Sequence, residues 1–161
     1  MTCKGVSRWL CGVAQDTHGR NNMENVIGYR HKVQYYETDK MAIVHHSNYI
    51  RWMEEARVDF LEKIGAPFDK LEEMGLLCPV TEVSCKYIGM VRFGETVTIH
   101  ARLAEFGGVK MIVKYTMTRE NGEVCCEAES RHCFICGERI VNLRRKFPEV
   151  YEKFVPYIES N

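Results

Sequence analysis

Apolar and polar residues alternate along several stretches of the chain, a pattern that predicts β-strands with one buried face. The first such stretch covers residues 29 to 36. From about residue 76 to residue 136 the alternation recurs in four stretches, of which the last, residues 124 to 136, is the longest. Gly107-Gly108 and Asn121-Gly122 stand between consecutive stretches, and the second pair is typical of a tight hairpin. We therefore expect these strands to be antiparallel neighbours.

A different spacing, of three and four residues, occurs between residues 48 and 64 and predicts a helix with one broad apolar face. Its apolar positions are Tyr49, Trp52, Met53, Ala56, Phe60 and Ile64. Ser47 or Asn48 can cap the start of this helix, and Gly65 supplies its end. A shorter helical turn is expected over residues 67 to 74. Because only the longer helix can cover a sheet face, the pattern predicts an α+β fold, a curved five-stranded antiparallel sheet around one long central helix.

The chain has 161 residues, which favours one compact domain. Residues 1 to 27 lack sustained periodicity and contain a polar run from 15 to 22, so we expect a poorly ordered N-terminal tail. The domain itself is assigned to residues 28 to 140. Residues 141 to 161, which contain Leu143-Arg-Arg-Lys and Pro148, are expected to form a C-terminal extension with a loop and a short peripheral helix.

Composition narrows the classes of partner. The chain has 22 basic and 22 acidic residues, so its net charge is about zero and nothing draws it generally to nucleic acid or an anionic membrane. No apolar run approaches the roughly 18 residues of a membrane span. Eight cysteines are scattered along the sequence, and no long apolar segment stands near the N-terminus. These features predict free thiols in a cytoplasmic protein that neither binds nucleic acid nor inserts into a membrane.

The densest polar segment is residues 36 to 49, between the first strand and the long helix. It brings a carboxylate, Asp39, and two imidazoles, His45 and His46, close to a helix N-terminus. Free backbone amides and the helix dipole can stabilise negative charge on an oxygen, while a carboxylate can act as nucleophile or general base. This combination suits acyl transfer. From the pattern alone, Asp39 could equally end a strand and His46 could fill space.

Three motifs carry a more specific signal: Tyr35-x-x-x-Asp39, Val44-His-His-Ser-Asn-Tyr49, and Glu54-x-Ala56-Arg57. Lys86-Tyr87 followed by Arg92-Phe93-Gly94-Glu95 adds a second stretch. Together they resemble the signature of the 4-hydroxybenzoyl-CoA thioesterase-like family of hotdog-fold acyl-CoA thioesterases. They also resemble the acyl-CoA thioesterases encoded beside the Tol-Pal system. The resemblance covers about residues 29 to 136.

The resemblance implies a hotdog fold that hydrolyses an acyl-CoA thioester to a carboxylic acid and free CoA, with no metal or bound cofactor. Asp39 then corresponds to the catalytic carboxylate, acting as nucleophile or as base for water. The backbone amide near His46 corresponds to the donor for the thioester carbonyl, and the His46 side chain to a group that orients substrate or water. The resemblance also implies a homodimer or a dimer of dimers with sites at the subunit interface.

Further positions match or depart from the family pattern. Asn48 matches the asparagine at the helix start and Tyr49 the aromatic residue that follows it, and we assign both to substrate binding together with His45. Many relatives carry glycines directly after the aspartate and an aromatic residue before the histidine. This chain has Lys40-Met41-Ala42 and His45 there. The pocket shape and acyl preference are therefore expected to depart from the family pattern at these positions.

Other carboxylates and basic residues offer alternatives. Another branch of hotdog thioesterases uses a helix glutamate, which makes Glu54 and Glu55 candidates, although we expect Glu54 to pair with Arg57 on the helix surface. The basic run of residues 144 to 146 could contact CoA phosphates, although a solvated surface run is the simpler interpretation. Cys133 and Cys136 invite a zinc site, but on a strand they point to opposite faces, so buried thiols are expected instead.

Two other functions remain open at this point. One is hydrolysis of a thioester on an acyl-carrier protein, which would need a basic docking rim. The other is a non-catalytic hotdog protein that binds or senses acyl-CoA. The carboxylate beside the helix start favours the enzyme.

Overall fold

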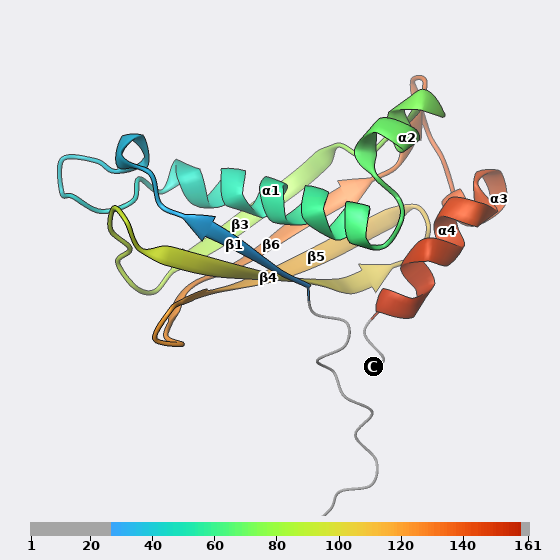
Figure 1. The fold of residues 1–161 in the computed structure, drawn as a ribbon. Coiled ribbons are helices and arrows are strands. Elements are labelled where there is room, and N and C mark those ends of the chain that lie inside the picture. Colours follow the sequence, from blue (N-terminus) through green and yellow to red (C-terminus); the bar gives the residue numbers. More distant parts are fainter. Residues whose placement is uncertain (1–26, 159–161) are drawn as a thin grey trace, which may run out of the picture.

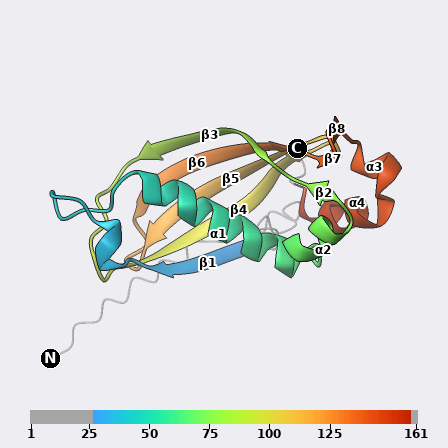
Figure 2. The same cartoon turned by 90° about the horizontal axis from the view of Figure 1, so that it is seen from above.

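In the computed structural model, which describes residues 27–158, five strands form one antiparallel sheet in the order β1-β4-β5-β6-β3. Figures 1 and 2 show this sheet as a curved layer. The prediction of a five-stranded antiparallel sheet is confirmed. The strands are β1 (Ile27–Lys32), β3 (Val80–Tyr87), β4 (Thr96–Phe106), β5 (Lys110–Arg119) and β6 (Val124–Cys133). Three short strands, β2 (Leu76–Leu77), β7 (Ile135–Cys136) and β8 (Arg139–Ile140), form a second sheet.

Helix α1 (Ser47–Lys63) lies along one face of the large sheet (Figure 2). Its apolar stripe and the alternate positions of the strands share one core, as the two periodicities predict. Trp52, Ala56 and Phe60 on the helix are fully buried, as are Val97, Ile99, Ala101 and Leu103 on β4. With 17 residues, α1 is the longest helix within residues 27–158, and α2 (Phe68–Glu73) follows it after a sharp turn.

Two predicted strands end earlier than the alternation suggested. β1 ends at Lys32, and a single 3-10 turn, η1 (Tyr35–Glu37), takes the chain away from the sheet. A capping box between Gln34 and Glu37 stabilises this turn. The last predicted strand divides into β6 and β7, and the fully buried Phe134 lies between them.

The C-terminal segment is not peripheral, so that part of our expectation was wrong. It forms α3 (Leu143–Lys146), α4 (Pro148–Phe154) and a 3-10 turn, η2 (Val155–Tyr157). Leu143 and Phe154 are fully buried, and the Phe154 ring stacks on Phe106 with their centres 4.6 Å apart. α3 and α4 lie at the opposite end of the sheet from η1 (Figure 1). These helices therefore complete the core at that end.

Three further predictions concern the N-terminal tail, the cysteines and membrane-spanning segments. The proposed tail, apart from Ile27 at the start of β1, lies outside the described residues. Within residues 27–158 all six cysteines are free. No helix of this part of the chain has the length and apolar character needed to cross a membrane.

Candidate active site

Asp39 lies in a tight loop between η1 and α1. An isolated antiparallel bridge between Thr38 and Val44 closes the base of this loop. The Asp39 amide donates a hydrogen bond to the Ile43 carbonyl (2.9 Å), and the Asp39 carboxylate accepts one from the Met41 amide (2.8 Å). These contacts fix the backbone around the carboxylate while leaving its second oxygen, Oδ2, for other partners.

The loop makes its turn at Ala42, whose φ of 57° lies in the left-handed region. This conformation favours glycine, and a side chain there costs free energy. The finding fits the resemblance, in which many relatives carry glycines after the aspartate. This chain makes a comparable turn with a residue less suited to it.

Helix α1 begins without the side-chain cap that we expected from Ser47 or Asn48. The cap position is His46, whose own side chain forms no capping hydrogen bond, although Nδ1 of His45 accepts one from the Ser47 amide (3.4 Å). The Ser47 hydroxyl contacts Nδ1 of His45 (2.8 Å), and the Asn48 amide donates to the Glu37 carbonyl (2.8 Å). We call this helix start uncapped because the residue at the cap position, His46, provides no side-chain acceptor, and the positive end of the helix dipole lies there.

A cavity of about 290 Å³ lies between the Asp39 loop, the start of α1 and the chain that follows β3. It contains three of the five predicted site residues, Asp39, His46 and Tyr49, and most of its other residues are apolar. Its walls are formed by Asp39, Met41, Ile43, Val44, His46, Tyr49, Tyr87, Ile88, Gly89, Met90 and Val91. A carboxylate, an uncapped helix start and an apolar slot thus meet in one place.

Tyr87 is a cavity residue that we did not assign to the site, although its motif was part of the resemblance. Its hydroxyl donates to the carbonyl oxygen of His46 (3.1 Å), and its ring packs edge to face with Tyr49, with the centres 5.1 Å apart. Burial raises the pKa of Tyr87 to about 12 and also raises that of Tyr49. Both phenols therefore stay protonated near neutral pH and can serve as hydrogen-bond donors rather than bases.

The other two predicted site residues do not line this cavity. His45 is exposed, and its ring lies against that of His46 with the centres 4.1 Å apart. Asn48 is buried and points toward Glu37. Their assignment to substrate binding stays a prediction, and the geometry gives Asn48 a structural contact instead.

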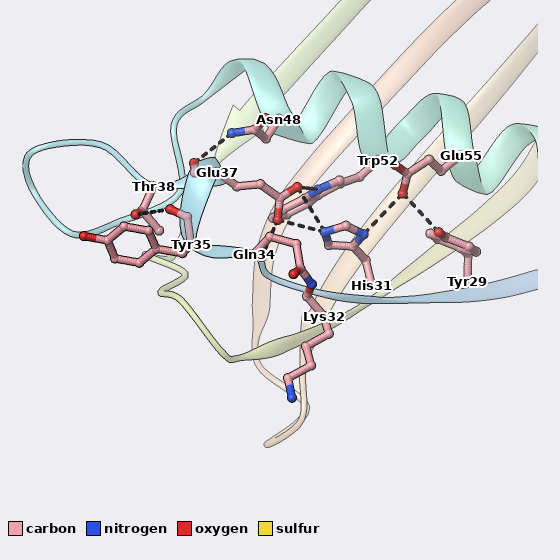
Figure 3. Close-up of polar contacts among 10 residues, drawn as sticks. All are labelled: Tyr29, His31, Lys32, Gln34, Tyr35, Glu37, Thr38, Asn48, Trp52 and Glu55. Carbon is pink, nitrogen blue, oxygen red and sulfur yellow. Dashed lines mark hydrogen bonds and ion pairs between the residues drawn. The ribbon is translucent and has the colours of Figure 1, made fainter.

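Sequence reasoning missed a buried acidic residue beside the site, Glu37, which is 4% exposed. Its carboxylate contacts His31 on β1 and Trp52 on α1 (Figure 3). Burial alone would raise the pKa of Glu37, but hydrogen bonds from His31, the Gln34 amide and Trp52 together lower it below its ordinary value. The only sequence signal was its position two residues before Asp39.

The alternative carboxylates lie away from the cavity. Glu54 is exposed, and Glu55 accepts a hydrogen bond from the Tyr29 hydroxyl (3.0 Å). The expected Glu54–Arg57 pair does not form, because Arg57 is buried with its guanidinium 4.9 Å from the centre of the Phe68 ring. The helix position of Arg57 explains the error, since it turns the side chain toward α2.

The remaining alternatives also find no support at this site. Within residues 27–158 no three His, Cys, Asp or Glu side chains are grouped as metal ligands. The basic residues 144 to 146 belong to α3, at the other end of the sheet from the Asp39 loop (Figure 1).

Comparison with known proteins gives a consistent result. The family model described as the thioesterase-like superfamily matches residues 33–155. An Aquifex aeolicus protein provisionally named an esterase is 35% identical over 122 residues, covering 76% of this chain and 94% of the relative. The Bacillus subtilis protein YneP, provisionally named an acyl-CoA thioesterase, is 32% identical over 127 residues, covering 76% and 92%.

Solved structures agree. A hypothetical protein of Thermus thermophilus is 37% identical with a TM-score of 0.76, over 81% of this chain and 98% of the other. The DHNA-CoA thioesterase of Staphylococcus aureus is 26% identical with a TM-score of 0.78, over 81% and 89%. The sheet that packs on α1 and the family match together place the chain in the thioesterase-like superfamily of hotdog proteins, whose reaction is thioester hydrolysis.

Proposed function

We propose that this protein hydrolyses an acyl-CoA to a carboxylic acid and free CoA, with Asp39 as the catalytic carboxylate. The observation that carries the proposal is that Asp39 and the uncapped start of α1 line the same apolar cavity. The CoA part of the substrate is supported by relatives whose names specify it, YneP and the Staphylococcus aureus DHNA-CoA thioesterase.

In the simplest form of the reaction, Asp39 acts as a general base. Its carboxylate takes a proton from a water molecule, and the hydroxide attacks the thioester carbonyl carbon. Amides at the start of α1, near His46, stabilise the negative charge that develops on the carbonyl oxygen. The C–S bond then breaks, and the CoA thiolate takes the proton from Asp39. A direct attack by Asp39, followed by hydrolysis of the anhydride, uses the same groups.

The size of the cavity indicates that it holds the acyl group of the substrate but not the whole CoA molecule. A volume of about 290 Å³ is near the lower limit for small-molecule sites, and its apolar lining suits an acyl group. The nucleotide part of CoA would then lie outside, on the protein surface. We assign the acyl chain to the apolar walls formed by residues such as Met41, Ile43 and Met90.

We also propose that a second copy of the chain completes the site, as a homodimer or a dimer of dimers. β3 is an edge strand of the large sheet, and exposed apolar residues lie on it and just beyond it. Val80 is 53% exposed, Tyr87 47%, Ile88 50% and Met90 64%, and the last three line the cavity. Pairing along β3 would cover both the open edge and this cavity wall. The free cysteines support a reducing, cytoplasmic setting for this assembly.

The substitution Asp39→Asn tests the catalytic assignment, because it keeps the side-chain volume and removes the charge. We expect kcat to fall by about 10² to 10⁴, with substrate affinity within a few-fold and unchanged stability. His46→Ala should cost less, since the backbone amide remains. Glu54→Gln, on the exposed face of α1, is the matched control and should be neutral.

The assay measures free thiol released from acyl-CoAs of graded length and aromaticity. If Asp39→Asn stays active while Glu54→Gln or Glu55→Gln abolishes turnover, the assignment of the chemistry is wrong. Tight binding of acyl-CoA without turnover would indicate a sensor instead. Release of thiol only from an acylated carrier protein would indicate the carrier-protein thioesterase.

A further inference from the structure

We propose that Glu37 is a positioning residue for hydrolysis, and that with His31 it holds the Asp39 loop in place against α1. The inference rests on the proposed catalytic role of Asp39. Glu37 does not line the cavity, so it acts through the residues that do.

The Glu37 carboxylate is fully engaged by donors from three parts of the chain (Figure 3). Oε1 accepts a hydrogen bond from the Trp52 indole of α1 (2.8 Å). Oε2 accepts one from the Gln34 amide (2.7 Å) and contacts Nε2 of His31 on β1 (2.9 Å). This network joins the end of β1, the η1 turn and the second turn of α1 at a single buried side chain.

His31 bridges two carboxylates. Its Nε2 contacts Glu37, its Nδ1 lies 3.2 Å from Glu55 Oε2, and its side chain is 12% exposed. Its ring lies over Trp52, with the centres 4.8 Å apart. One imidazole ring therefore links the buried Glu37 carboxylate to Glu55 on the exposed face of α1.

The backbone of Glu37 adds one further link to α1 and one to the residues that lead into it. Its carbonyl oxygen accepts hydrogen bonds from the His45 amide and from the Asn48 side chain, both 2.8 Å. Asn48 and Trp52 are four residues apart on α1 and so lie on the same side of the helix. Glu37 is thus tied to the helix start by both its backbone and its side chain.

Asp39 follows Glu37 by only two residues, and the residue between them, Thr38, forms the bridge to Val44 that closes the base of the loop. The position of Glu37 relative to α1 therefore sets where the Asp39 carboxylate lies relative to the amides near His46. A shift of about 1 Å between reacting groups can reduce a rate by about 10²-fold.

The residue type argues for a role beyond filling the core. Glu37 is the one acidic side chain that is buried within residues 27–158. Burying a carboxylate, even one with partners, seldom stabilises a protein more than apolar packing does. A buried carboxylate with several hydrogen bonds instead fixes the relative positions of the segments that it joins. Here these segments lie next to the proposed catalytic residue, Asp39.

The test compares Glu37→Gln, His31→Gln and the double variant with the Glu54→Gln control. For Glu37→Gln we expect kcat to fall by about 10- to 100-fold with KM within threefold, measured at least 15 °C below the melting temperature of each variant. For His31→Gln, which leaves the Trp52 and Gln34 bonds, we expect a smaller fall. Because the two residues act as one unit, the double variant should resemble Glu37→Gln rather than show the product of both effects.

A merely structural role would lower the melting temperature and leave kcat of the folded enzyme unchanged, which would overturn the inference. If Glu37→Gln does not fold, full kcat in His31→Gln would overturn it instead. Failure of the proposed function has a different outcome, an active Asp39→Asn. An inactive Asp39→Asn together with a fully active Glu37→Gln would reject the positioning role alone.

Discussion

His132 should make this protein sensitive to mild acid. The side chain lies on β6 and is 2% exposed, with Nε2 2.7 Å from the Ser130 hydroxyl. Its Nδ1 and one guanidinium nitrogen of Arg57, Nη1, are buried without a hydrogen-bond partner in the described part of the chain. Burial, and secondly the positive charge of Arg57, lower the pKa of His132 to about 4. Its protonation is therefore strongly disfavoured in the folded state.

The sign and size of the effect follow from linkage. As the pH falls, the unfolded chain takes up the proton first, near pH 6.5, so folding stability is lost between about pH 6.5 and pH 4. The full loss of folding free energy is about 3 kcal/mol, because the pKa values of the unfolded and folded states differ by roughly 2.5 and each pKa unit corresponds to about 1.36 kcal/mol. Between pH 7 and pH 5 the loss is about 2 kcal/mol.

Urea unfolding of the wild type and of His132→Gln at pH 7 and pH 5 measures this loss. Glutamine does not titrate, and the other ionisable groups are common to both proteins, so they cancel in the comparison. We expect the wild type to lose about 2 kcal/mol more than the variant over this range. Equal losses in the two proteins would show that His132 is not the group that takes up the proton, and the reasoning from its burial would fail.

Three further predictions, which use five substitutions, test the fold by urea unfolding at pH 7. Ala42→Gly should raise the free energy of unfolding by about 0.5 to 1 kcal/mol, because it relieves a left-handed alanine, and a loss of stability would contradict this. Phe154→Ala should lower the free energy of unfolding by about 3 to 5 kcal/mol, whereas Val155→Ala, at a side chain that is 40% exposed, should lower it by less than about 1 kcal/mol. Equal losses in the two variants would mean that α4 does not belong to the core. Gly108→Ala and Gly122→Ala both place alanine at φ near 80°, but only at Gly108 would the new β-carbon lie 3.1 Å from the C-terminal segment. We expect the free energy of unfolding to fall by about 1 kcal/mol in Gly122→Ala and by at least about 2 kcal/mol in Gly108→Ala. The reverse order would refute the close contact between Gly108 and the C-terminal segment.

The main elements were predictable because their apolar spacing matches their burial. The stripe that contains Trp52 and Phe60 marked α1 to within one residue at each end, and the Asn121-Gly122 turn marked the β5–β6 hairpin. Asp39, His46 and Tyr49 were found together because all three lie within eleven residues of sequence, on a segment that must enter the helix. Local patterns sufficed where local structure decides the outcome.

The features that the sequence did not predict depend on tertiary contacts between separate elements. The Glu37 network joins His31, Glu37 and Trp52, and no spacing rule connects these positions. Likewise, Phe154 is buried against Phe106 at the end of β4 and against Phe134, both distant from it in the sequence. Arg57 looked like a surface partner for Glu54 because its burial depends on where α2 lies. Each error reflects tertiary packing that the linear pattern does not encode.

The bridge between Thr38 and Val44 has a consequence for how such proteins diverge. It separates an anchored base from a tip of four residues, 40 to 43, of which Met41 and Ile43 line the cavity. Mutations in the tip can reshape the acyl slot without moving Glu37 or breaking the bonds that fix the base. Related proteins can therefore change their preferred acyl group through a few substitutions at the tip while the position of the proposed catalytic carboxylate stays the same.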